Sequence, residues 1–128
     1  MWSAQRETYF SKSQSMKKTD KKHEKLIVGA LTEVCGVALD EVAGFQWLTH
    51  RVKYSHFPGS LSVHCIFATQ SELSDALLAK QDDFLRSLIG EKLRAVGIPL
   101  KDIARQVRFD TEEACALEHG GRWQDRLR

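Results

Sequence analysis

The sequence has no apolar run long enough to cross a bilayer. Stretches such as Leu-Ile-Val-Gly-Ala-Leu at 26–31 fall far short of the roughly 20 residues that a membrane helix needs. Residues 1–15 contain no apolar segment of the kind found in secretory signals. Cysteine is scarce, and Cys35, Cys65 and Cys115 are odd in number and widely separated, which argues against a disulfide framework. These absences predict a protein of the reducing cytoplasm that has no membrane partner.

Signatures of catalysis and of metal binding are missing as well. The only His-Gly-Gly sequence, at 119–121, is too short to be a phosphate-binding glycine loop. Cys115 and His119 have the spacing of two metal ligands, but a structural zinc site needs four ligands and no second pair is spaced in this way. Cys65 and His64 point to opposite faces of their expected strand, so they cannot act together as nucleophile and base. We therefore expect no enzyme, no metal, no cofactor and no small-molecule substrate.

What is present is an ordinary globular composition with an uneven charge. At 128 residues, 42% hydrophobic and 28% charged, the chain suits one domain with its own core. We expect residues 1–19 to form a flexible basic extension, residues 20–113 a single α+β domain, and residues 114–128 a polar tail with a short helix. Met-Lys-Lys from Met16 has the pattern of a natural bacterial start, which would make residues 1–15 dispensable.

The hydrophobic pattern predicts that the domain begins with a helix. Apolar side chains recur at helical spacing over residues 20–43, and Gly44 is suited to end that helix. Gly36 costs about 1 kcal/mol relative to Ala within a helix, so we expect a break near this residue. A later helical pattern covers residues 82–97 and is expected to end at Gly97.

A β-hairpin is predicted between these helices. Aromatic and β-branched residues at 45–54 and an alternating pattern at 61–69 predict two antiparallel strands. Pro58-Gly59 predicts a type II turn between them. Thr69 and Glu72 have the spacing of a capping box and predict a further short helix before the later one.

Residues 97–113 fit two alternatives, a helix-turn-helix of the arabinose-regulator type or a helical turn followed by a closing strand. The first would aim a recognition helix with several carboxylates at DNA, which electrostatics opposes. Those carboxylates are Asp110, Glu112, Glu113 and Glu118. We therefore predict a helical turn at 99–104 and a strand at 106–111 that joins the sheet.

The expected core lies between one face of the sheet and the two longer helices. On the sheet it comprises Leu61, Val63, Cys65, Phe67, Val107 and Phe109. On the helices it comprises Ile27, Leu31, Val34, Leu85, Leu88, Ile89 and Leu93. This arrangement leaves the opposite face of the sheet for function.

Candidate nucleic-acid-binding residues fall into three groups, because cations with a nearby aromatic side chain suit a phosphate backbone and a base. The first group is in the basic N-terminal region: Lys17, Lys18, Lys21 and Lys22. The second shares one face of the first strand: Trp47, Arg51 and Lys53. The third lies on the later helix: Arg86, Lys92 and Arg94.

The stretch Asp-Asp-Phe-Leu-Arg-Ser-Leu-Ile-Gly-Glu-Lys-Leu-Arg-Ala-Val-Gly-Ile-Pro, at 82–99, resembles the characteristic helix of ribosome-binding factor A. The order of helix, hairpin, helix and closing strand is also similar to the KH type II-like fold of that family. The resemblance implies an RNA- or ribosome-associated protein. Where the family has an Ala-x-Gly kink, this chain has Ala79-Lys80-Gln81, and no Gly-x-x-Gly loop is present.

From Met16 onward the chain also resembles small proteobacterial proteins often labelled Fis-family transcriptional regulators. The segments that carry this resemblance are Met-Lys-Lys-Thr-Asp-Lys-Lys, Gly-Phe-Gln-Trp-Leu-Thr-His, Phe-Asp-Thr-Glu-Glu-Ala-Cys and Gly-Gly-Arg-Trp. That label implies a DNA-binding regulator, although true Fis proteins are helical dimers that end in a helix-turn-helix.

Three functions follow from these observations. The leading hypothesis is a small non-enzymatic protein that associates with nucleic acid, with RNA or the ribosome favoured over duplex DNA. The second is a protein-interaction or homodimerisation module that uses the hairpin edge or the tail around Trp123. The third is the transcriptional regulator that the family label implies.

Overall fold

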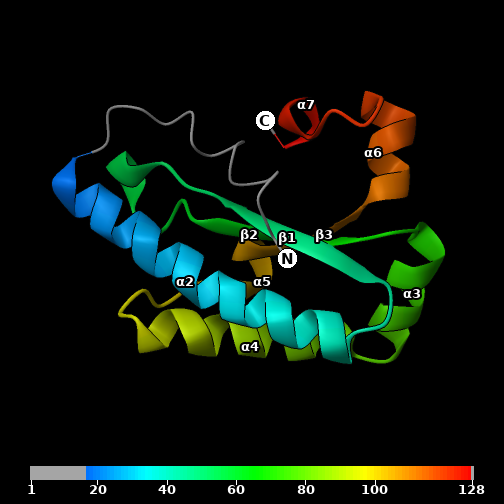
Figure 1. The fold of residues 1–128 in the computed structure, drawn as a ribbon, viewed down its shortest axis with the longest axis horizontal. Helices are drawn as coiled ribbons and strands as arrows, with labels where there is room; N and C mark the ends of the chain where they lie inside the picture. Colours follow the sequence, from blue (N-terminus) through cyan, green and yellow to red (C-terminus); the bar gives the residue numbers. More distant parts are fainter. Residues whose placement is uncertain (1–16, 128) are drawn as a thin grey trace.

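The computed structural model describes residues 17–127 and shows a three-stranded sheet with helices on both faces (Figure 1). The elements, in chain order, are α2 (Lys18–Glu41), β1 (Phe45–Arg51), the 3-10 turn η1 (Tyr54–His56), β2 (Ser62–Phe67), α3 (Gln70–Leu78), α4 (Gln81–Ala95), α5 (Ile103–Gln106), β3 (Val107–Thr111), α6 (Glu112–His119) and α7 (Trp123–Arg126). This order confirms the expected α+β class. Most of the expected N-terminal extension, residues 1–16, lies outside the described residues.

The sheet has the order β1-β2-β3, with β1 antiparallel to β2 and β3 parallel to β2. A register shift between Phe45 and Trp47 inserts one extra residue into β1. Because of this bulge, Phe45 and Leu48 both reach the core, although they are three residues apart. Trp47 and the alternate residues after it therefore lie on the opposite face, which we call the outer face of the sheet.

The inner face packs on α2 and α4, as expected from the sequence. Every predicted core residue of α2 is buried, and Leu88 and Phe109 are the two predicted core residues that are only partly buried. The helix α2 continues through Gly36 without a break, and a Cβ atom there would meet nothing within 4 Å. The expected break is therefore wrong, because packing of the apolar stripe outweighs the propensity cost of one glycine.

The loop between β1 and β2 differs from the predicted type II turn. Gly59 does not have the positive φ that this turn requires, and the Phe57-Pro58 peptide is cis. The strands end earlier than expected, and the loop is closed by η1 and by Ser60, whose side chain bonds the backbone N and O of Lys53 at 2.9 and 2.7 Å. Buried Gln106 holds the loop from α5, since its amide nitrogen donates to the carbonyl of Leu61 at 2.9 Å.

Residues 97–119 do not form a helix-turn-helix. The strand β3 separates α5 from α6, and it pairs with β2 over its full length from Val107 to Thr111. The predicted strand is confirmed almost to the residue, whereas the helical turn lies later than expected, at 103–106. Thr111 then caps α6 by accepting a hydrogen bond from the backbone N–H of Ala114 at 3.0 Å. Within residues 17–127, no helix is both long and apolar enough to cross a membrane.

Candidate nucleic-acid interface

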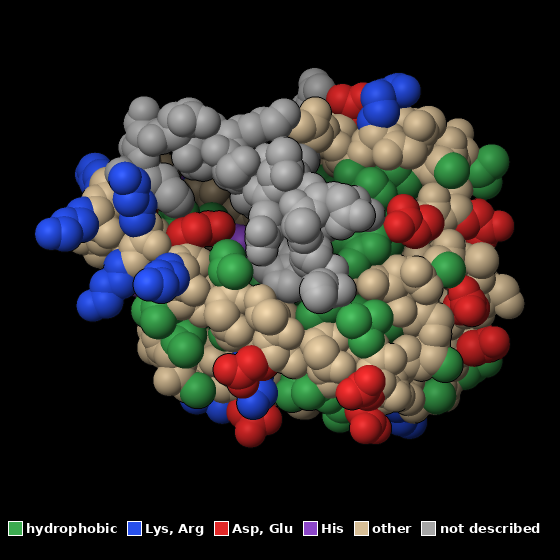
Figure 2. Space-filling view, in the orientation of Figure 1, with side chains coloured by type: hydrophobic (Ala, Val, Ile, Leu, Met, Phe, Trp, Pro, Cys, Tyr) green, Lys and Arg blue, Asp and Glu red, His purple; other side chains and the backbone are tan. Residues whose placement is uncertain are grey.

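The first turns of α2 carry the lysines of the first candidate group, and all four are exposed. Two contacts fix this part of α2 beside the β1–β2 loop. The His23 ring stacks on Phe57 with centroids 4.5 Å apart, and Tyr54 donates a hydrogen bond to Glu24 at 2.7 Å. Figure 2 shows the resulting gathering of basic side chains at one end of the molecule.

Glu24, which lies among these lysines, is already engaged by neighbours in the fold. Its carboxylate contacts Nε2 of the fully buried His50 at 3.2 Å through both oxygens. Burial acts to raise the pKa of Glu24, but the hydrogen bond and charge of His50, together with the Tyr54 hydroxyl, outweigh burial and hold this pKa below its ordinary value. Burial and the nearby Glu24 carboxylate raise the pKa of Tyr54.

Further cations approach the same end from the outer face of the sheet. In the sheet register, Arg51 of β1 lies opposite Ser62 of β2, and His64 of β2 lies opposite Arg108 of β3. His64 is only 8% exposed. Burial, then the charge of Arg108 and that of Arg51, lower the pKa of His64 to about 4, so the imidazole is neutral at pH 7.

The start of β3 and the turn before it complete this basic region. Exposed Arg105 pairs with Asp102 at 3.1 Å, and its Nη2 donates to the carbonyl oxygen of Gly59 at 3.5 Å. Nε of Arg108 donates to the carbonyl oxygen of Arg105 at 3.3 Å. We call this region the basic end. It comprises Lys17, Lys18, Lys21, Lys22, Lys25, Arg51, Lys53, Lys101, Arg105 and Arg108.

Four cations of the basic end are not among the residues predicted from sequence: Lys25, Lys101, Arg105 and Arg108. The parity of β3 could have indicated Arg108, because it alternates with the core residues Val107 and Phe109. Its position next to His64 depends on β3 joining β2 in parallel, and sequence spacing does not reveal that register.

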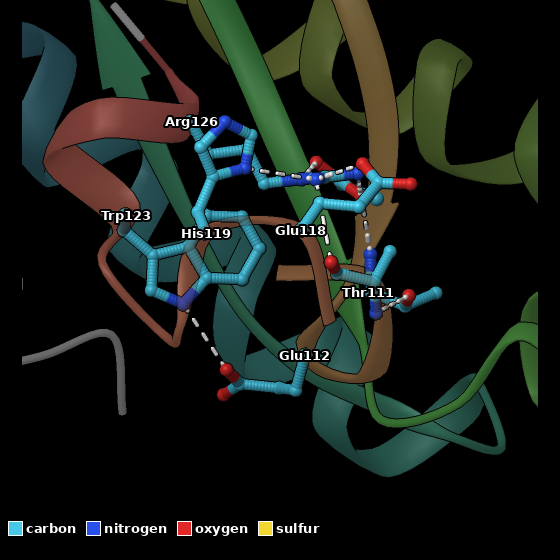
Figure 3. Close-up of polar contacts among 8 residues, drawn as sticks. Thr111, Glu112, Glu118, His119, Trp123 and Arg126 are labelled. Carbon is cyan, nitrogen blue, oxygen red and sulfur yellow. Dashed lines mark hydrogen bonds and ion pairs between the residues drawn. The ribbon is translucent and has the colours of Figure 1, made fainter. Parts of the chain in front are cut away.

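Trp47 lies on the expected face of β1, but it does not form the exposed aromatic platform that we predicted. It is 6% exposed, and α7 packs against it, with the Trp123 ring nearly perpendicular to the Trp47 ring and the two centroids 5.0 Å apart. Both indole N–H groups donate to one carboxylate, that of Glu112, at 2.7 and 3.1 Å. Figure 3 shows the bond from Trp123 to Glu112 at the start of α6.

Arg126 holds α7 in this position. Its guanidinium pairs with Asp110 on β3 and with Glu118 on α6, and it also donates to the carbonyl oxygen of Ala114 at 3.4 Å (Figure 3). The hydrogen bonds to Asp110 and then Glu118 raise the pKa of Arg126 above its ordinary value. Segment 114–127, which we expected to be a polar tail with a short helix, thus packs against the sheet through two helices.

The cations of α4 do not form one surface. Arg86 is half-buried, pairs with Asp82 at 2.6 Å, and lies 5.0 Å from the centre of the Phe109 ring. Lys92 pairs with Glu33 on α2 at 3.2 Å. Arg94 is exposed in the last turn of α4, which lies at the same end of the molecule as the first turns of α2 (Figure 1).

Cys115 and His119, the two residues with metal-ligand spacing, both lie in contact with other parts of the fold. Cys115 is fully buried, and burial raises the pKa of its thiol. Nδ1 of His119 lies 3.3 Å from Nη1 of Arg126. Across the described residues, no group of three or more His, Cys, Asp or Glu side chains is arranged to hold a metal ion.

Comparison with protein-family models, with curated proteins and with solved structures finds no match to this chain.

Proposed function

We propose that this protein is a non-enzymatic nucleic-acid-associated protein of the cytoplasm whose basic end binds the phosphate backbone of RNA. The observation that carries the proposal is the gathering of cations from α2, β1, α5 and β3 at one end of the fold. The carboxylates among these cations are fewer: Asp20 in the first turn of α2, Glu24, which contacts His50, and Asp102, which pairs with Arg105. A cluster of this kind attracts a polyanion and gains free energy by releasing its counterions.

The lysines of α2 lie at the N-terminus of the helix, where they do not favour its stability, and this supports a role in binding. The N-terminus of a helix carries a partial positive charge, so cations there destabilise the helix by a few tenths of a kcal/mol each. Here Lys18, Lys21 and Lys22 lie in the first turns, and Lys17 provides no side-chain cap. Stability alone would favour carboxylates at these positions, whereas phosphate binding favours lysines.

RNA is favoured over duplex DNA for two reasons. The segment that would have to enter a major groove contains the strand β3, and α6 begins with Glu112 and Glu113. The resemblance of residues 82–99 to ribosome-binding factor A also supports a partner in RNA or the ribosome.

The test compares two double charge reversals in the full chain. Lys21→Glu with Lys22→Glu should weaken binding of a fluorescently labelled single-stranded RNA at least about tenfold in an anisotropy titration. The slope of log Kd against log salt should fall by about 0.7 for each phosphate that the variant no longer neutralises. Duplex DNA of the same length should bind the parent more weakly than RNA does.

The matched control is Lys80→Glu with Arg122→Glu. It changes the net charge by the same amount, but both residues are exposed and lie outside the basic end. We expect this control to bind RNA within about twofold of the parent. Equally weakened binding in the two variants would mean that only net charge matters, and unchanged binding by the α2 variant would refute the proposal.

A further inference from the structure

The end of the molecule opposite the basic end exposes large apolar side chains where α3 meets α4. Leu77 is 45% exposed, Leu78 is 83% exposed and Phe84 is 39% exposed. In the described part of the chain, the other exposed large hydrophobic residues are Leu39 and Leu117. Three of these five therefore lie within one short stretch, which we call the α3–α4 surface: Leu77, Leu78 and Phe84.

Carboxylates surround the α3–α4 surface. Asp75 precedes it on α3, and Asp82 and Asp83 occupy the first turn of α4, where the helix dipole favours negative charge. Asp82 pairs with Arg86 at 2.6 Å, whereas Asp83 is 70% exposed and lies 3.7 Å from Arg86, so Asp83 is the carboxylate of this turn most open to a partner. Lys80 is an exposed cation at the joint itself, with φ of 60°.

Neighbouring elements bring further negative charge to this end. Gly44, which follows α2, lies so close to α3 that a Cβ atom there would be 2.8 Å from Cβ of Glu72. The last turn of α2, with Asp40 and Glu41, is therefore next to α3. Glu113 of α6 also reaches α3, where it accepts a hydrogen bond from the backbone N–H of Gln70 at 2.7 Å. Figure 2 shows acidic and apolar side chains side by side at this end.

We propose that the α3–α4 surface docks a cationic amphipathic segment of a partner protein. Exposed leucines gain free energy when they are buried, and a rim of carboxylates selects an apolar segment that also carries lysine or arginine. RNA does not fit, because the carboxylates repel phosphate. A second copy also fits poorly, because two α3–α4 surfaces facing each other would bring the exposed carboxylates Asp75 and Asp83 against those of the other copy.

The test uses a labelled helical peptide of leucine and lysine, about five turns long, with its leucines on one face. We expect Leu78→Ser in the full chain to weaken binding of this peptide about tenfold in an anisotropy titration. Because Leu78 is 83% exposed, the variant should unfold at the same temperature as the parent. Lys80→Glu removes the opposing cation and should strengthen binding roughly threefold.

Leu117→Ser provides the matched control, since Leu117 is 81% exposed but lies on α6. Its peptide affinity should equal that of the parent, and so should that of Lys21→Glu with Lys22→Glu, which makes the outcome independent of RNA binding. An equal reduction of affinity in the Leu78 and Leu117 variants would overturn the proposal. So would equally tight binding of a leucine–glutamate peptide, or self-association of the parent in sedimentation velocity that Leu78→Ser abolishes.

Discussion

His64 is the residue whose protonation should be most visible in the stability of the fold. It lies between Arg51 and Arg108 on the outer face, with Asp110 as the nearby carboxylate and His50 as a further positive group when protonated. Its pKa is about 4 in the folded chain against an ordinary value of 6.5. The unfolded chain therefore binds a proton more readily than the folded chain does. The stability that neutral His64 contributes is complete above about pH 6.5 and is lost as the pH falls towards 4.

We expect His64→Gln to remove this pH dependence. Urea unfolding of the parent should show a free energy of unfolding that falls by up to about 3 kcal/mol between pH 6.5 and pH 4 because of this residue. Glutamine keeps a hydrogen-bonding side chain near Ser62 but does not titrate. The variant should lose correspondingly less stability over this range, and an identical pH profile in both proteins would contradict the assignment.

Arg126 should contribute far more stability than an exposed arginine of the same segment. Arg126→Gln removes the guanidinium that pairs with Asp110 and Glu118, and its side chain is only 15% exposed. We expect a loss of about 2 kcal/mol in the free energy of unfolding, because hydrogen bonds between charged groups are involved. Arg122→Gln, which breaks an exposed pair with Asp125, should change it by less than about 0.5 kcal/mol. Similar losses from both variants would show that the Arg126 pairs with Asp110 and Glu118 add no more stability than an exposed ion pair.

Replacing Gly36 or Gly97 by alanine should change the stability of the protein in opposite directions. Gly36 lies inside α2 and has open space around its Cα, so Gly36→Ala should stabilise the protein by about 1 kcal/mol. Gly97 follows α4 with φ of 83°, and Gly97→Ala should destabilise it by a similar amount, about 1 kcal/mol. Thermal unfolding would measure both changes, and a destabilising Gly36→Ala would indicate that α2 bends at this position.

Elements with a strong local pattern could be predicted from the sequence. The alternation in β2 and the apolar stripe of α4 identified the core, and the capping bond from the backbone N–H of Glu72 to Thr69 Oγ1 forms at 3.1 Å as its spacing predicts. The closing strand was also placed, because the parity of Val107 and Phe109 matches a half-buried strand.

The predictions that were wrong concern features that depend on contacts between segments distant in the sequence. The parity of Trp47 indicated its face correctly, but it did not reveal the contact with Trp123 from the far end of the chain. The Gln106 side chain donates hydrogen bonds to the carbonyl oxygens of Pro58 and Leu61 in the β1–β2 loop. These bonds join residues far apart in the chain, so no local sequence pattern reveals them. The candidate site changed for the same reason: the predicted lysines of α2 remain, Trp47 is buried, and Lys25, Lys101, Arg105 and Arg108 are added.

At the scale of the whole molecule, charge is segregated along the fold. The basic end is built from the first turns of α2, the end of β1, α5 and the start of β3, whereas α3, the start of α4 and the end of α2 form an end at which carboxylates outnumber cations (Figures 1 and 2). Such a separation orients the protein on a polyanion and leaves the α3–α4 surface pointing away from it. One end would thus bind RNA while the other end remains accessible to a partner protein.

The most direct measurement is a titration of the isotopically labelled full chain with single-stranded RNA, followed by the backbone amide NMR signals. If the basic end binds RNA, signals from the first turns of α2, from residues 50–53 and from residues 105–108 should shift together and return with added salt. Signals from residues 77–84 should stay in place. Shifts centred on 77–84, or no shifts at low salt, would contradict the claim that the basic end is the nucleic-acid interface.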